Sequence, residues 1–384
     1  MTETFRALRI GIAGSGNRSQ SYARAFGQVD RVRVTAATAG GRLAAELQRM
    51  IPGISVERDA GALIRRAQVD AIVFADPVTD LPAVVRRALL ADKHVLATMS
   101  SPVTCRQLDE LVSLARKRER LLLFTEERLF HPALVFLKWM LSGRSGLWRP
   151  RYLRAISVPG AGNGSGVSLA TLVVEELGIC ARLLGDSPAS VSGVVCRAEA
   201  EAMPAAAFIN MVYSDGKIAS LQVSTTEAQE SRQWTLATPS KTVLLDECDA
   251  RSPVKIISFD SVASPGIPLR VNPPIPLAEW PTESTVTPPL GTTDIKVDQC
   301  RHFVESVLNH DLREGNAASW AEVALVWEAV QESMRLDGMP VSLNAAAERE
   351  RRAVGERPKL RLIHGKGMGT VDARKRPALT LVPR

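Results

Sequence analysis

Residues 8–19 read LRIGIAGSGNRS, and the predicted fold is built outward from this segment. The apolar run before Gly14 predicts a buried strand, and residues 18–27 predict a helix after it. Between them stands G-x-G-x-x-S, a near match to the dinucleotide-binding pattern G-x-G-x-x-G, with Ser19 at the third position. Gly14 and Gly16 would permit a tight turn and a close approach of the backbone to a pyrophosphate.

The start of this helix would complete a nucleotide site. Its first backbone N–H groups have no partners within the helix, and the positive end of the helix dipole would face the phosphates. We therefore name Gly14, Ser15, Gly16, Asn17 and Arg18 as candidate cofactor-binding residues. The alternative is a turn of the same kind that only packs a strand against a helix.

The end of the next strand bears on which dinucleotide would bind. NAD-binding folds usually place Asp or Glu there to bind the ribose hydroxyls, but residues 36–42 read AATAGGR. Thr38 and Arg42 could instead accept a 2′-phosphate, which favours NADP over NAD. The alternative, that this loop holds no nucleotide, stays open.

Strand and helix patterns alternate through the first part of the chain. The continuous apolar run at residues 71–75 is typical of a central parallel strand, which is buried on both faces. Alternation of this kind predicts a doubly wound parallel sheet. The fold class we expect is α/β, with a Rossmann dinucleotide-binding domain over residues 1–125.

The pattern changes after residue 125 and predicts a second, α+β domain over residues 126–343. Closely spaced strand-like runs, with a hairpin turn at Asp215-Gly216, predict an open and mainly antiparallel sheet. Helices are expected at 294–309 and 319–336, packing back on the first domain, with Ser319 as a helix cap. The expected strands are 151–158, 189–197, 206–213, 217–225, 232–237 and 242–246.

Charge and cysteine usage narrow the class of protein. The 384 residues carry a net charge of +7, and residues 348–384 alone hold eleven Lys or Arg against four Asp or Glu. Residues 344–384 are therefore expected to form a flexible basic tail rather than a nucleic-acid-binding arm, which remains the alternative.

The five cysteines form no CxxC or Cys/His cluster, so no metal site is predicted. With neither a secretory signal nor an apolar run long enough to span a membrane, the expected compartment is the cytoplasm.

Several further segments resemble the Gfo/Idh/MocA oxidoreductases, a family that includes glucose–fructose oxidoreductase and inositol dehydrogenase. The resemblance runs from about residue 8 to 343 and implies NAD or NADP as cofactor. It places Asp76 and Pro77 in the turn beside the nicotinamide. It also implies a homo-oligomer formed through the exposed face of the antiparallel sheet. The segments that carry it, beyond the glycine turn, are 70–77, 88–96, 128–132, 303–306 and 328–333.

The chain departs from this family at the catalytic residues. Ser101 stands where the family has a lysine, and counting back from Gly185 puts Glu175 at the position of the catalytic histidine. Glu175 or Glu176 could accept a proton if burial raised a carboxyl pKa toward neutrality. The alternative is that one of two adjacent helix carboxylates faces solvent.

Two residues near the start of the second domain complete the candidate site. Arg128 could bind an anionic group of the substrate, or pair with Glu126 or Glu127, and His131 would lie at the rim of the cleft.

The favoured function is hydride transfer between NAD(P) and a sugar, polyol or related small molecule. The alternative is a catalytically degenerate member that serves as a regulatory or assembly subunit. Neither a membrane nor a nucleic acid is expected as a partner.

Overall fold

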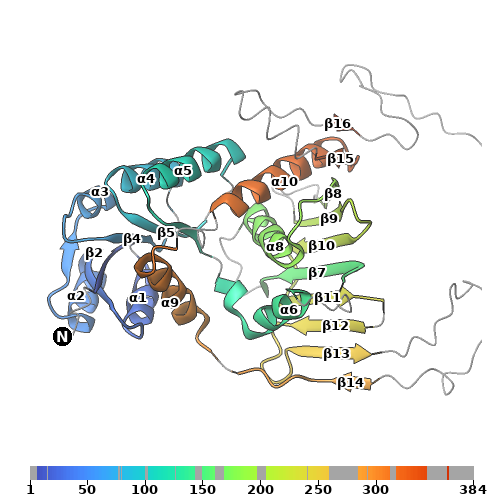
Figure 1. The fold of residues 1–384 in the computed structure, drawn as a ribbon, viewed down its shortest axis with the longest axis horizontal. Coiled ribbons are helices and arrows are strands. Elements are labelled where there is room, and N and C mark those ends of the chain that lie inside the picture. Colours follow the sequence, from blue (N-terminus) through green and yellow to red (C-terminus); the bar gives the residue numbers. More distant parts are fainter. Residues whose placement is uncertain are drawn as a thin grey trace, which may run out of the picture.

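The first domain is built on a parallel sheet (Figure 1). In the computed structural model its strand order is β3-β2-β1-β4-β5-β6, and every pairing is parallel. The strands are β1 (Leu8–Ala13), β2 (Val32–Thr38), β3 (Ser55–Glu57), β4 (Ala71–Phe74), β5 (His94–Ala97) and β6 (Leu122–Phe124). The helices are α1 (Asn17–Phe26), α2 (Gly41–Met50), α3 (Ala60–Ile64), α4 (Leu81–Leu90) and α5 (Cys105–Lys117). The predicted doubly wound α/β fold is confirmed.

The structure describes residues 7–14, 16–76, 78, 80–99, 103–125, 127–142, 149–160, 168–196, 205–239, 241–258, 284–291, 293–311, 317–343 and 361–362. The predicted tail lies outside this part of the chain, apart from one short strand, β16 (Arg361–Leu362). Among the described helices, none has the length and apolarity needed to cross a membrane.

Local sequence explains several boundaries in the first domain. β4 is AIVF and all four residues are buried, as expected for a central parallel strand. The Asp80 side chain accepts a hydrogen bond from the Ala83 amide and begins α4. Thr104 and Gln107 form a reciprocal capping box at the start of α5. These caps fix where the helices begin and therefore where the loops at the carboxyl edge of the sheet lie.

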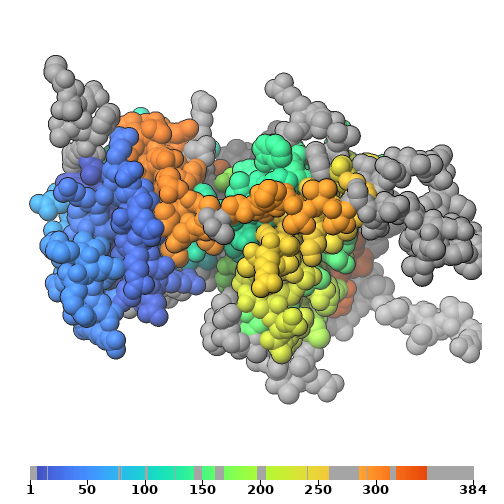
Figure 2. Space-filling view, turned by 90° about the horizontal axis from the view of Figure 1, so that it is seen from below, coloured from blue at the N-terminus to red at the C-terminus, as the bar shows by residue number. Residues whose placement is uncertain are grey.

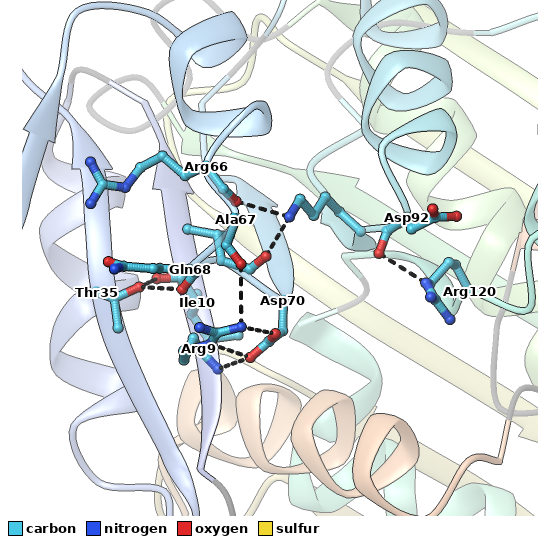
Figure 3. A network of polar contacts seen from close by, with 11 residues as sticks. Arg9, Ile10, Thr35, Arg66, Ala67, Gln68, Asp70, Asp92 and Arg120 are labelled. Carbon is cyan, nitrogen blue, oxygen red and sulfur yellow. Dashed lines mark hydrogen bonds and ion pairs between the residues drawn. The ribbon is translucent and has the colours of Figure 1, made fainter.

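Polar contacts hold the opposite, amino edge of this sheet (Figure 3). The Arg9 guanidinium binds Asp70 through Nε–Oδ2 at 2.8 Å and Nη2–Oδ1 at 2.6 Å, which joins β1 to the segment before β4. The buried Lys93 ammonium donates to the carbonyl oxygens of Arg66 and Val69 at 2.9 and 2.6 Å. The candidate site lies at the carboxyl edge of the sheet, where open α/β sheets usually bind their ligands.

The second domain is a mixed sheet in the order β14-β13-β12-β11-β7-β10-β9-β8-β15-β16. Within this sheet, β7 and β10 are the only described strands that pair in parallel, so the expected mainly antiparallel sheet is confirmed. Its strands are β7 (Tyr152–Val158), β8 (Ser190–Cys196), β9 (Ala206–Val212), β10 (Ile218–Ser224), β11 (Ser231–Ala237), β12 (Lys241–Asp246), β13 (Val254–Ser258), β14 (Ser284–Val286), β15 (Val341–Ser342) and β16. The 3-10 helix η1 (Glu127–Phe130) and helix α6 (Pro132–Ser142) open the domain, and α8 (Leu169–Leu184) packs on its sheet.

The two closing helices join the domains. α9 (Ile295–Leu308) packs against α1 and η1, and its Cys300 and Phe303 belong to the core under the first sheet. Figure 2 shows the orange segment that contains α9 running between the blue first domain and the green and yellow second domain. α10 (Ala317–Arg335) packs against α5, α8 and β8. The predicted cap at Ser319 was wrong, because the helix already includes Ala317 and Ala318, both strong helix formers.

Candidate functional site

The glycine turn after β1 is shaped by contacts with β2 and α1. The Gly14 amide donates to Thr38 Oγ1 at 2.8 Å, and the Thr38 hydroxyl donates back to the Gly14 carbonyl at 3.1 Å. A Cβ on Gly14 would stand 2.3 Å from Ser19 Oγ, so a side chain here would prevent the close approach of α1. Thr38 therefore holds the turn itself.

Helix α1 begins at this turn without a side-chain cap. Gly16 is the N-cap residue and has extended backbone (φ −116°, ψ −172°), and Asn17 is the first helical residue. The helix has no acidic side chain in its first turn. The Gly16 amide donates to Asp76 Oδ2 at 2.8 Å. Asp76, just after β4, is thus placed against the turn.

The residues of the glycine turn and the start of α1 fit the pyrophosphate of a dinucleotide, the cofactor that the fold implies. The cradle in which a pyrophosphate would lie is the space beside the two glycines: a Cβ on Gly14 would stand 2.8 Å, and one on Gly16 3.4 Å, from the Asp76 carboxylate, and the positive end of α1 faces this space. The Asp76 carboxylate is a competing anion within that cradle. Of the other cofactor candidates, Ser15 and Pro77 lie outside the described residues, as does Ser101.

Arg42 lies on the surface of α2. Its side chain is 92% exposed, and its Nε is 2.7 Å from Glu46 Oε1. Glu46 also accepts a hydrogen bond from Gln20 on α1. The nearest charged neighbour of Arg42 is therefore a carboxylate, which would have to release it before a 2′-phosphate could bind.

A cavity of about 210 Å³ lies between the two domains at the carboxyl edge of the first sheet. Its walls come from α1, η1, α8, α9 and α10, and from Thr98 and Thr125, which follow β5 and β6. Trp320 of α10 forms part of the wall. A Cβ on Gly178 would stand 3.3 Å from the Trp320 ring, so glycine at this position lets α8 and α10 pack closely.

Glu175 is the carboxylate of α8 that lines this cavity. It is partly buried, and no described residue forms a hydrogen bond or ion pair with it. Burial raises its pKa above the ordinary value, although the nearby Arg128 charge acts in the opposite direction. A carboxyl group in this state can accept a proton at a pH closer to neutrality than an exposed one.

Glu176, the next residue, is used differently. Its side chain is 1% exposed and is ion-paired with Arg128 Nη1. Arg128 also binds Glu247, with Nη2–Oε1 at 2.7 Å and Nε–Oε2 at 3.0 Å. Burial alone would lower the pKa of Arg128, but the two carboxylates outweigh it and raise that pKa. Arg128 touches the cavity wall while its charge is balanced inside the protein.

His131 does not line the cavity. Its Nδ1 accepts a hydrogen bond from the Ala133 amide at 3.3 Å, at the beginning of α6. Burial lowers its pKa, which favours the neutral ring that this contact requires. The structure therefore brings Arg128 and Glu175 to one cavity and leaves His131 and Arg42 elsewhere.

A cation that the sequence analysis did not single out also lines the cavity. Lys296 near the start of α9 places its Nζ 2.7 Å from Glu127 Oε1 and 4.6 Å from the centre of the Tyr22 ring. The Tyr22 hydroxyl donates to the same Glu127 oxygen at 3.0 Å. No local motif marks Lys296, because its position depends on α9 packing back against α1.

Comparisons with known proteins place this site in context. No protein-family model matches the chain. A dTDP-3,4-didehydro-2,6-dideoxy-alpha-D-glucose 3-reductase from Streptomyces violaceoruber is 35% identical over 130 residues, which is 34% of this chain and 37% of the relative. A UDP-N-acetylglucosamine 3-dehydrogenase from Acidithiobacillus ferrooxidans is 27% identical over 234 residues, which is 59% of this chain and 70% of the relative.

Solved structures resemble the chain over most of its length. The Acidithiobacillus ferrooxidans dehydrogenase has a TM-score of 0.69 at 18% identity and covers 86% of this chain and 99% of its own. A levoglucosan dehydrogenase in complex with NADH has a TM-score of 0.70 at 14% identity, over 88% of this chain and 99% of its own. The chain has the fold of the Gfo/Idh/MocA oxidoreductases.

The structure shows which charged side chains line the cavity where this sequence departs from the pattern expected for the Gfo/Idh/MocA fold. The position predicted to replace the catalytic histidine is Glu175, and its side chain reaches the cavity. Lys296 and Arg18 are cations that line the same cavity from α9 and α1.

Proposed function

We propose that the protein is an NAD(P)-dependent oxidoreductase that acts on a CH–OH group of a sugar or related small molecule. The observation that carries the proposal is the position of Glu175, a carboxylate with a raised pKa in the interdomain cavity at the carboxyl edge of the first sheet. Ligands of open α/β sheets bind at this edge. The fold and the two curated sugar-converting relatives support the same reaction class.

The cofactor would lie across the glycine turn. Gly14, Gly16 and the first amides of α1 at Asn17 and Arg18 would hold its pyrophosphate, with Ser15 in the same turn. Thr38 fixes the shape of the turn and Asp76 follows β4 at the same edge. Asp76 and Pro77 are proposed to lie beside the nicotinamide. Either NAD or NADP is proposed, and Arg42 could serve the latter by leaving Glu46. The nicotinamide, when bound, supplies the hydride acceptor or donor.

The side chains of the cavity would handle the proton and the substrate. Glu175 would take the proton of the reacting hydroxyl, because loss of a hydride from the alcohol carbon requires that proton to leave as well. Lys296 would supply the positive field that the family draws from a lysine at the position of Ser101. Arg128 would contribute to the wall while Glu176 and Glu247 hold it in place. Ser101 remains a proposed substrate-positioning residue, and His131 would act on the substrate only through the start of α6, where it accepts the Ala133 amide.

A nucleotide-linked sugar is the proposed substrate class. The names of both curated relatives specify a reaction at position 3 of such a sugar. We therefore propose oxidation of a C3 hydroxyl, or reduction of the corresponding ketone. A cavity of about 210 Å³ would hold the sugar ring, with the nucleotide extending outward.

A homo-oligomer is proposed through the outer face of the second sheet. The helices α8 and α10 pack on the inner face. The outer face exposes large apolar side chains, namely Val194, Phe208, Val212, Ile218 and Leu244. An exposed patch of this kind favours association between protein surfaces. A reducing compartment such as the cytoplasm is proposed as well, because it would keep the exposed Cys196 and Cys248 as thiols.

Two measurements test the proposal. Titration with NADH and NADPH, followed by nicotinamide fluorescence, should show saturable binding. A panel of UDP- and dTDP-linked sugars, free sugars and polyols should then produce reduced nicotinamide from NAD or NADP. Absence of binding to both dinucleotides would contradict the proposal. Binding without turnover of any panel member would favour the alternative, a degenerate regulatory or assembly subunit.

A further inference from the structure

The Asp76 carboxylate occupies part of the anion cradle at the start of α1. Its Oδ2 accepts the Gly16 amide at 2.8 Å. The same oxygen would lie 2.8 Å from a Cβ on Gly14, and both carboxylate oxygens would lie 3.4 Å from a Cβ on Gly16. The carboxylate therefore lies across the two glycines that would approach a pyrophosphate.

The Asp76 carboxylate therefore lies where the fold offers hydrogen-bond donors to the phosphates of a bound dinucleotide. An uncapped helix start has unpaired N–H groups and a partial positive charge, which stabilise any anion close to it. The Gly16 amide can serve Asp76 or a phosphate oxygen, but the two anions repel each other if they share it. Charged acceptors form stronger hydrogen bonds than neutral ones, so an ionised Asp76 competes well.

We propose that Asp76 is a negative determinant of dinucleotide affinity, because its carboxylate must leave the Gly16 amide before a pyrophosphate can bind. This inference rests on the proposed function. It assigns to Asp76 a role opposite to that of a cofactor ligand. The pyrophosphate group of NADH or NADPH is the ligand chemistry with which it competes.

Two substitutions separate competition from support. Asp76→Asn keeps the size of the side chain and an oxygen for the Gly16 amide but removes the charge. Asp76→Ala removes the acceptor as well. If Asp76 competes with the pyrophosphate, both variants should bind NADPH and NADH more tightly than wild type. The expected decrease in Kd is about tenfold, because a neutral side chain, or none, would compete less strongly than the carboxylate for the Gly16 amide.

Asp80→Asn is the matched control. It removes the same charge four residues away, and asparagine caps a helix as well as aspartate does, so the bond to the Ala83 amide should persist. Kd values would be measured by nicotinamide fluorescence at one ionic strength. Inorganic pyrophosphate, used as a competitor of NADPH, would show whether the gain belongs to the pyrophosphate subsite. The inhibition constant of pyrophosphate, obtained from its effect on the apparent Kd of NADPH, should be lower for Asp76→Asn than for the control.

The outcomes keep the two proposals apart. Tighter binding by both Asp76 variants, with Asp80→Asn unchanged, supports the inference. Unchanged or weaker binding by Asp76→Asn and Asp76→Ala would overturn it and leave the proposed function intact, since Asp76 would then be neutral or a true ligand. If wild type and all variants fail to bind NADH and NADPH, both the inference and the proposed function are overturned.

Discussion

Arg128 binds Glu247 through two parallel hydrogen bonds, Nη2–Oε1 at 2.7 Å and Nε–Oε2 at 3.0 Å. Arg128 lies in η1, where the second domain begins, and Glu247 follows β12. Glu176 on α8 forms a second ion pair with the same guanidinium, through Nη1. The three side chains are 16%, 6% and 1% exposed, respectively, so they form a buried cluster that joins η1, the sheet and α8 behind the cavity wall.

Glu247→Gln should destabilise the fold because it leaves Arg128 buried with one carboxylate. Removing one member of a buried ion pair costs about 3 kcal/mol or more. Urea denaturation would measure the free energy of unfolding. Glu110→Gln, which breaks an exposed pair with Arg106, is the control and should change it by less than about 0.5 kcal/mol. Equal effects of the two substitutions would argue against the buried cluster.

His94 should make the fold sensitive to mild acid. Burial, followed by the Arg120 charge, lowers its pKa to about 4, and its Nδ1 accepts the Leu121 amide at 3.0 Å. Because the unfolded chain, with a pKa of about 6.5, binds the proton first, stability is lost as pH falls from about 6.5 to 4, by about 3 kcal/mol in total. His94→Asn keeps an acceptor, so it should flatten this part of the pH profile of unfolding. An unaltered profile would refute the assignment.

Lys296→Met should slow turnover more than it weakens dinucleotide binding. Loss of the ammonium removes a positive charge from the cavity, and we expect kcat to fall about 10- to 100-fold. Lys296→Arg restores the charge and should recover part of the loss. A purely structural link to Glu127 would lower thermal stability in Lys296→Met without shifting the pH dependence of kcat. That pH profile is the readout that separates the two roles.

Phe208→Arg should dissociate the proposed oligomer. Phe208 is 43% exposed on the outer face of the second sheet, and a buried charge at its position would be costly in an interface. Light scattering coupled to size exclusion gives the molar mass. Leu90→Arg, at a 40% exposed position on α4, serves as the control and should leave the mass unchanged. A wild-type protein that is monomeric at all concentrations would contradict the oligomer proposal.

Much of the architecture could be predicted because it depends on local patterns. The glycine turn, the apolar β4 and the hairpin at Asp215-Gly216 each have a characteristic sequence. β13 was not among the expected strands, because its five residues, VKIIS, lack a strict alternation of apolar and polar side chains. The start of α10 was also placed wrongly, since a capping pattern at Ser319 lies inside a longer helix.

The candidate site was less predictable because it depends on contacts between distant segments. Glu175 and Glu176 are adjacent in sequence, and only the packing of α8 sends one to the cavity and the other to Arg128. Lys296 reaches the cavity because α9 returns to the first domain. The contact between Asp76 and Gly16 joins residues that are 60 positions apart.

The most direct test is the production of reduced nicotinamide by wild type and Glu175→Gln, with a nucleotide-linked sugar and NAD or NADP at several pH values. Wild type should oxidise the sugar faster as pH rises through the raised pKa of Glu175, when its carboxylate can accept the proton. Glu175→Gln should bind dinucleotide normally and lose about 10²- to 10⁴-fold in kcat. Glu175→Gln turning over at the wild-type rate, with the same pH dependence, would contradict the assignment of Glu175 as the proton acceptor.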